Sequence, residues 1–152
     1  MLEREGAGGY SVAAGDPSQR RLMIIGIGMD VVEVERVAEL LERHPERACS
    51  KLFTPAEVGR CRRSRVPHES FAARFAAKEA FFKAIGTGWG RGGSWTDVEV
   101  VSSPIGAPSI TLSGEARRRA EELGVARVHL TLTHTHRIAG ACVVLEGRPE
   151  PR

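Results

Sequence analysis

The sequence predicts an α+β domain in which one long central helix packs on a small antiparallel sheet. The helix is indicated by Ser70–Ile85 (SFAARFAAKEAFFKAI), which combines strong helix formers with phenylalanines at helical spacing. An apolar run bounded by glycine, Leu22–Gly28, is typical of a buried strand. Alternation across Val128–Leu132 and a second apolar run at Ile138–Leu145 indicate a C-terminal hairpin that turns near Thr133–Arg137.

The chain divides into three parts along its length. Residues 1–22 are rich in Gly, Ala, Ser and charge without periodicity, so we predict a flexible N-terminal extension. Residues 23–146 form one domain without an internal repeat, and residues 147–152, with two prolines, form a flexible tail. A chain of 152 residues fits one domain around one core.

Helical spacing predicts a first helix over Val31–His44, which Pro45 should end because proline disfavours a helical residue before it. A short helix should then start at Pro55, with Thr54 as its cap and Glu57 completing a capping box.

The long helix should end at Gly86, where the loop GTGWGRGGS begins, and its five glycines would let backbone approach a ligand closely. Beyond the loop we expect strands at Val98–Val101 and Ser109–Leu112 and a helix at Gly114–Leu123.

The composition excludes several classes of protein. No apolar run approaches the roughly 18–20 residues that span a bilayer, so no membrane association is expected. Three scattered cysteines without a CxxC pair favour a reducing, cytoplasmic setting. The net charge is +3, which suits an anionic partner, but aromatic residues make up only 5% of the chain, which disfavours nucleic-acid binding.

Asp30 lies between the predicted first strand and first helix, where a carboxylate holds a cation or caps the helix. Its position alone favours the cap. The surrounding GIGMD lacks the third glycine of GxGxxG, so a dinucleotide site is disfavoured.

The long helix carries two charged pairs at a spacing of four residues, Arg74 with Lys78 and Glu79 with Lys83. Such pairs are commonly solvated and contribute only a few tenths of a kcal/mol, roughly. However, the helix runs into the glycine-rich loop, and carboxylate, lysine and glycine together are what a diphosphate site requires. No Walker A motif is present, which disfavours an ordinary NTPase.

Two further groups of residues have a simple and a functional interpretation. His134 and His136 would face one side of a strand, but no further His/Cys cluster supports a zinc site there. Arg36 and Arg43 share a stripe of the first helix, with Arg47 just beyond Pro45. Taken alone, the arginines favour a solvated face over a docking stripe for an acidic partner.

Three segments together resemble the carrier-protein synthase group of the 4′-phosphopantetheinyl transferase superfamily. They are GIGMDVVEVERV (Gly26–Val37), FAARFAAKEAFFKAIGTG (Phe71–Gly88) and LTLTHTHRIAGACVVLE (Leu130–Glu146). The resemblance implies the fold of that family and a homotrimer with active sites between subunits. It also implies transfer of 4′-phosphopantetheine from coenzyme A to a serine of an acidic acyl carrier protein, with release of adenosine 3′,5′-bisphosphate.

The resemblance assigns roles to individual positions. Asp30 and Glu79 match the residues that hold Mg²⁺, and with Lys83 they make up the catalytic set. Coenzyme A, the co-substrate, is expected near Arg74, Lys83, Gly86 and His134. We hypothesise that Glu79 accepts the proton of the serine, directly or through a water on the metal.

The resemblance also makes the docking stripe at Arg36, Arg43 and Arg47 the favoured interpretation of those arginines. The alternative function is a non-catalytic nucleotide-binding protein or a structural subunit of a synthase complex. The sequence leaves open which carrier protein and pathway are served, and how widely acyl derivatives of coenzyme A are accepted.

Overall fold

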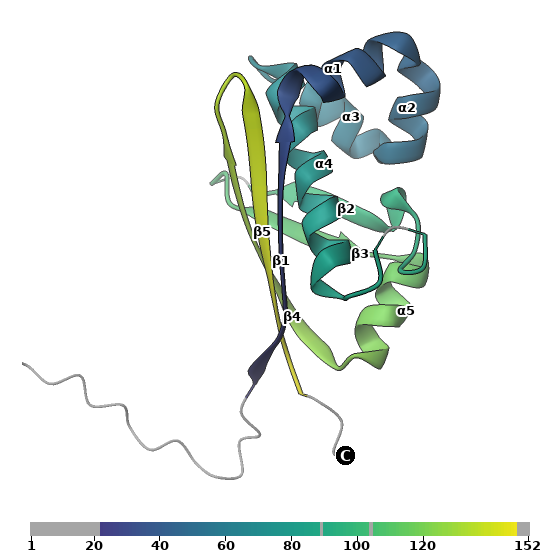
Figure 1. The fold of residues 1–152 in the computed structure, drawn as a ribbon, viewed down its shortest axis with the longest axis vertical. Helices are drawn as coiled ribbons and strands as arrows, with labels where there is room; N and C mark the ends of the chain where they lie inside the picture. Colours follow the sequence, from purple (N-terminus) through teal and green to yellow (C-terminus); the bar gives the residue numbers. More distant parts are fainter. Residues whose placement is uncertain (1–21, 89, 104, 149–152) are drawn as a thin grey trace, which may run out of the picture.

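The computed structural model describes residues 22–88, 90–103 and 105–148 and confirms an α+β fold (Figure 1). Three strands form an antiparallel sheet in the order β1-β5-β4, and β2 and β3 form a separate two-stranded sheet. The elements in chain order are β1 (Met23–Glu33), α1 (Val34–Arg43), α2 (Pro45–Leu52), α3 (Pro55–Arg62), α4 (Pro67–Ala84), the 3₁₀ turn η1 (Trp95–Asp97), β2 (Val98–Ser102), β3 (Pro108–Leu112), α5 (Gly114–Glu122), β4 (Val125–His134) and β5 (Ile138–Gly147).

Helix α4 is the centre of the fold. It lies between the three-stranded sheet and the β2-β3 hairpin, with α1, α2 and α3 gathered at one end of the molecule (Figure 1). Its alanines and phenylalanines are buried on several sides, so most of the surface of the helix packs against other elements. It begins at Pro67, three residues before the predicted start, because proline is well accommodated in a first helical turn.

Strand β1 contacts α4 backbone to backbone through two glycines. A Cβ atom on Gly28 would lie 1.9 Å from the carbonyl oxygen of Ala80, and one on Gly26 would lie 2.3 Å from that of Ala84. Neither neighbour is a flexible side chain, so any side chain here forces the strand and the helix apart. The close contact sets where the rest of β1 lies relative to α4.

We therefore expect Gly28→Ala to destabilise the protein by roughly 1–3 kcal/mol or more, through overpacking against rigid backbone. Urea unfolding measures the effect. Gly59→Ala is the matched control, because its Cβ would meet only the mobile end of Arg63, at 3.3 Å, in the middle of α3. The Gly59 variant should be neutral or slightly more stable. Equal losses in both variants would contradict the backbone contact.

The predicted boundary between the first strand and the first helix is wrong. β1 continues past Gly28 to Glu33, because its last residues pair with β5, Asp30 with Ala141 and Glu33 with Ile138. The helix starts only at Val34, with Glu33 at its N-cap position. Asp30 is therefore not a helix cap; it lies within a strand.

The remaining elements follow the prediction closely, with one omission. The capping box of Thr54 and Glu57 is present, and β4 and β5 form the expected hairpin. Pro45 ends α1 as predicted, but it also opens α2, which the sequence analysis did not identify. Residues 1–21 and 149–152, which hold most of the predicted extension and tail, lie outside the described residues.

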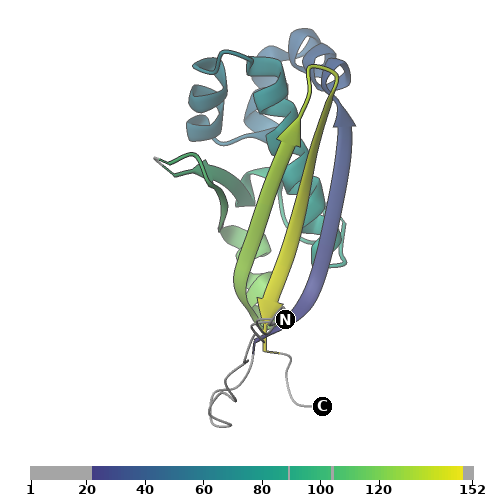
Figure 2. The same cartoon turned by 90° about the vertical axis from the view of Figure 1, so that its left-hand side faces the viewer.

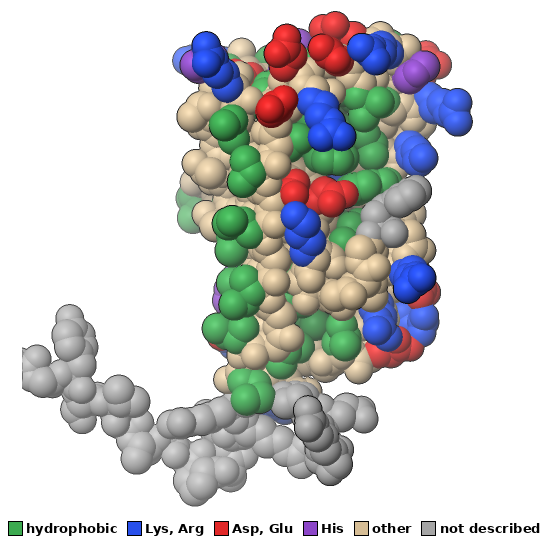
Figure 3. Space-filling view, in the orientation of Figure 1, with side chains coloured by type: hydrophobic (Ala, Val, Ile, Leu, Met, Phe, Trp, Pro, Cys, Tyr) green, Lys and Arg blue, Asp and Glu red, His purple; other side chains and the backbone are tan. Residues whose placement is uncertain are grey.

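The outer face of the three-stranded sheet carries exposed apolar side chains. Ile27, Met29 and Val31 of β1 are 61%, 63% and 59% exposed. They pair with Val144, Cys142 and Gly140 on the same face of β5. No described helix lies in front of this sheet in Figure 2, and apolar side chains gather along the same edge in Figure 3. The sheet thus has one face packed on α4 and one apolar face open.

Candidate active site

Asp30, Glu79 and Lys83 come together where β1 crosses α4. The Nζ atom of Lys83 donates a hydrogen bond of 2.8 Å to Asp30 Oδ1 and one of 3.1 Å to the carbonyl oxygen of Met29. The Asp30 side chain is 16% exposed and that of Lys83 is 52% exposed. The glycine contact between β1 and α4 explains this meeting, because Asp30 follows Gly28 on the same face of the strand.

Glu79 shares the electrostatic environment of Asp30. Burial raises the pKa of the Glu79 carboxyl, the negative charge of Asp30 raises it further, and Lys83 partly opposes both. Two carboxylates that oppose each other's ionisation are stabilised by a shared cation. Magnesium commonly takes one or two protein carboxylates and fills its shell with phosphate oxygens and water, so this donor set fits it.

Part of the increase in the pKa of Glu79 comes from the charge of Asp30, and this part can be measured. In Asp30→Asn the pKa of Glu79 should fall, because burial still raises it but the negative charge of Asp30 no longer does. Since the folded-state pKa exceeds the unfolded one, Glu79 favours folding at low pH. That contribution disappears as the pH rises through the folded-state pKa. A carbon-detected NMR titration of the Glu79 carboxyl in both proteins tests this, and an unchanged pKa would contradict it.

Arg74 and His134 lie at a second location. They line one cavity of about 310 Å³ together with Ser70, Ser102 and residues of β3 and β4. Arg74 is only 5% exposed, and its Nη1 atom donates a hydrogen bond of 2.9 Å to the hydroxyl of Ser70. His134 is the last residue of β4. His136, in the following turn, lines a different cavity. The two histidines therefore do not face the same side of one strand, as the sequence suggested.

Helix α4 separates these two groups. Arg74 and Glu79 are five positions apart, which places them about 140° apart around the helix axis. None of Asp30, Glu79 and Lys83 lines the cavity that holds Arg74 and His134. Gly86 follows the helix in a left-handed conformation, with φ of 73° and open space where its Cβ would lie.

One interpretation of the sequence placed Lys78 in a solvated pair with Arg74, and the structure shows that this is wrong. It is fully buried, and its Nζ atom donates 2.7 Å to Glu57 Oε2 and 3.0 Å to the carbonyl oxygen of Trp95. The other oxygen of Glu57 accepts a 2.8 Å hydrogen bond from the backbone of Val100. Burial lowers the pKa of Lys78, which Glu57 partly offsets. This pair joins α3, α4 and β2.

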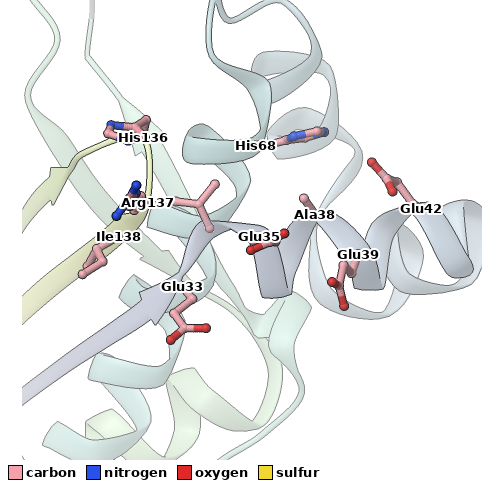
Figure 4. A pocket seen from close by; sticks show the side chains of 10 residues that line it. Glu33, Glu35, Ala38, Glu39, Glu42, His68, His136, Arg137 and Ile138 are labelled. Carbon is pink, nitrogen blue, oxygen red and sulfur yellow. The ribbon is translucent and has the colours of Figure 1, made fainter.

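The arginines of the predicted docking stripe lie beside an acidic surface. Figure 4 shows glutamates at the end of β1 and along α1, with His68 at the start of α4 and His136 and Arg137 in the β4-β5 turn nearby. Together these residues line a cavity of about 920 Å³. Arg36, Arg43 and Arg47 are all exposed, but none lines this cavity. Arg43 pairs with Glu39 at 3.4 Å. The cavity is lined by Glu33, Val34, Glu35, Ala38, Glu39, Glu42, His68, His136, Arg137 and Ile138.

The family model of the 4′-phosphopantetheinyl transferase superfamily matches residues 26–141, and the chain belongs to that superfamily. It is similar to the holo-(acyl-carrier-protein) synthase of Solibacter usitatus, 44% identical over 124 residues that cover 82% of this chain and 99% of that protein. A second such synthase, from Anaeromyxobacter dehalogenans, is 48% identical over 128 residues, with coverage of 82% and 98%.

Solved structures extend the similarity to the fold. The holo-(acyl-carrier-protein) synthase of Neisseria meningitidis superposes with a TM-score of 0.75 at 32% identity, covering 81% of this chain and 98% of that one. The Helicobacter pylori synthase, solved in complex with coenzyme A, gives 0.70 at 29% identity, with coverage of 78% and 98%. Among the described residues, no helix combines the length and apolarity needed to cross a membrane.

Proposed function

We propose that this protein transfers 4′-phosphopantetheine from coenzyme A to a serine of an apo acyl carrier protein. The observation that carries the proposal is the meeting of Asp30, Glu79 and Lys83 at the β1-α4 contact. It is supported by the relatives of high coverage that are named for this activity and by a relative bound to coenzyme A. The free state of all three cysteines supports a cytoplasmic setting.

In this reaction the serine oxygen forms a bond to the β-phosphorus of coenzyme A, and the bond from that phosphorus to the bridging oxygen breaks. Adenosine 3′,5′-bisphosphate leaves with the electron pair. Asp30 and Glu79 would hold Mg²⁺, which neutralises charge on the diphosphate when bound. Lys83, half exposed beside Asp30, adds a cation at the same point. Glu79 accepts the proton of the serine, directly or through an intervening water, since a carboxylate that also holds Mg²⁺ would be a weak base.

Arg74 and His134 bind coenzyme A in the cavity that they share, and Gly86 lets the backbone approach the ligand at the end of α4. Since α4 separates this cavity from Asp30 and Glu79, one site is completed by two copies of the chain. The open apolar face at Ile27, Met29 and Val31 provides the surface for that assembly, which we propose is a homotrimer.

Mixing two inactive variants tests the shared site. Glu79→Gln and Arg74→Ala should each be inactive alone, but co-expressed copies should form sites that combine one intact half from each. With random mixing in a cyclic oligomer, about a quarter of the sites regain both halves. The transfer rate of the purified mixture measures this. Activity no higher than that of the single variants would place both halves in one copy.

The carrier protein docks on the exposed arginines of α1 and α2. Arg36 and Arg47 have no acidic partner within ion-pair distance among the described residues, so both are available to an acidic helix. The glutamates beside them repel the same partner and restrict how it can approach.

The activity itself is tested by mixing the protein with apo carrier protein, coenzyme A and Mg²⁺ and weighing the carrier by mass spectrometry. We expect a gain of one phosphopantetheine, abolished by a chelator and by Asp30→Ala. No gain on a panel of fatty-acid and polyketide carriers, from folded protein, would favour a non-catalytic binding protein.

A further inference from the structure

The ammonium group of Lys83 is bound to the strand that carries Asp30. Its Nζ atom donates 2.8 Å to Asp30 Oδ1 and 3.1 Å to the carbonyl oxygen of Met29. An ammonium group has three donors, so most of the hydrogen-bonding capacity of Lys83 is used on β1. Although its side chain is 52% exposed, Lys83 is therefore held against β1.

Lys83 is placed to balance both carboxylates of the site. The hydrogen bond to Asp30 raises the pKa of Lys83, burial opposes this, and the charges of Asp30 and Glu79 raise it further. In return, the charge of Lys83 lowers the pKa of Glu79, against the effects of burial and of Asp30. One cation thus serves two carboxylates, which is also what a divalent cation between them would do.

Lys83 and a divalent cation oppose each other at Asp30. Mg²⁺ binds carboxylate oxygens at about 2.0–2.1 Å and requires nearly octahedral geometry. An ammonium nitrogen 2.8 Å from Asp30 Oδ1 would then lie within roughly 5 Å of a metal on that oxygen. The repulsion between a divalent and a monovalent cation is twice that between two single charges at the same distance. A metal on Asp30 therefore weakens the contact between Asp30 and Lys83, and the contact weakens the binding of the metal.

We propose that Lys83 competes with the divalent cation for Asp30 and, given the proposed function, that the diphosphate of coenzyme A relieves this competition by binding the lysine. A half-exposed ion pair is weak, and the flexible stem of a lysine lets its ammonium group turn from β1 to a phosphate oxygen. The free protein thus binds the cation weakly. Coenzyme A strengthens that binding because it supplies phosphate oxygens and also draws Lys83 away from Asp30.

The first test measures Mn²⁺ binding to the protein alone, with free Mn²⁺ counted by electron paramagnetic resonance. Lys83→Met should bind Mn²⁺ roughly 3- to 30-fold more tightly than wild type, because the competing cation is gone. Lys83→Arg keeps the cation and should bind as weakly as wild type. Lys51→Met is the matched control, since it removes the same charge from an exposed position on α2 and should leave the affinity unchanged.

Asp30→Asn identifies the ion that is counted. Combined with Lys83→Met, it should abolish the gain in affinity, because the ligand for which lysine and metal compete is lost. Mn²⁺ binding that is no tighter in Lys83→Met than in wild type would overturn the inference, and so would the absence of measurable binding in both proteins. A gain that survives Asp30→Asn would also overturn it, because the ion would then lie elsewhere.

The second test repeats the titration with saturating coenzyme A, after subtraction of the Mn²⁺ that coenzyme A binds in solution. Coenzyme A should raise the Mn²⁺ affinity of wild type by a larger factor than that of Lys83→Met, in which only the phosphate oxygens contribute. Equal factors would refute the part assigned to the diphosphate. Neither titration needs a carrier protein or turnover. Tighter Mn²⁺ binding in Lys83→Met would uphold the competition even if no carrier were modified, and unchanged binding would refute it even if transfer were confirmed.

Discussion

Glu79→Gln should reduce kcat for phosphopantetheine transfer by about 100- to 10,000-fold, the usual range for removing a general base. The substitution keeps the shape of the side chain but removes the proposed proton acceptor and one of the two carboxylates proposed to hold Mg²⁺. Because Glu79 lies at the partly exposed β1-α4 contact, the fold should be retained. Mass spectrometry of the carrier under saturating substrates measures the rate.

Glu69→Gln is the matched control for this loss, since it makes the same chemical change in the first turn of the same helix. Its transfer rate should equal that of wild type. A magnesium titration divides the roles of Glu79, because loss of metal binding alone would be partly restored at high Mg²⁺. A near-normal rate in Glu79→Gln would remove both roles for the residue.

Lys78→Met should destabilise the protein by about 3–5 kcal/mol, because it leaves the Glu57 carboxylate buried without its cation. The side chains of both partners are fully buried, and Glu57 is further fixed by the backbone amides of Thr54 and Val100. Urea unfolding followed by fluorescence of the buried Trp95 reports the change. Glu57→Gln combined with Lys78→Met should recover part of the loss.

Lys83→Met makes the same change on the same helix and provides the contrast. Lys83 is half exposed and pairs with Asp30 near the surface, so its loss should change stability by less than about 1 kcal/mol. Lys83→Met should instead lower the rate of phosphopantetheine transfer. Comparable destabilisation by the two variants would show that burial does not distinguish the two lysines.

Local signals in the sequence predicted much of this fold. The composition of α4, the capping box at Thr54 and the alternation in β4 each act within a few residues, and each appears in the structure. The end of β1 was mispredicted because residues Met29–Glu33 are held as strand by pairing with β5, more than a hundred residues away. Helix α2 was missed because Pro45 was considered only as a stop signal.

The residues of the site were likewise predicted where the signal is local, and were mispredicted where a contact with a distant segment decides. Asp30, Glu79 and Lys83 were predicted together through family resemblance, and the structure brings them together. Spacing along α4 also suggested that Arg74 and Lys78 formed a solvated face, and this was wrong. The partner of Lys78 is Glu57, whose only visible signal in the sequence was its role as a helix cap. Pattern along one helix does not reveal which face the rest of the chain will cover.

The pairing of β1 with β5 has a consequence for how the protein is made. Asp30 is synthesised early, but the strand that fixes its position is β5, near the end of the chain. Most of the protein must leave the ribosome before β1 can take its place in the sheet, since β5 lies between β1 and β4. A nascent or truncated chain that lacks Ile138–Gly147 would lack the strand that holds Asp30 next to Lys83. The contact between Asp30 and Lys83 therefore forms only after most of the chain has been synthesised.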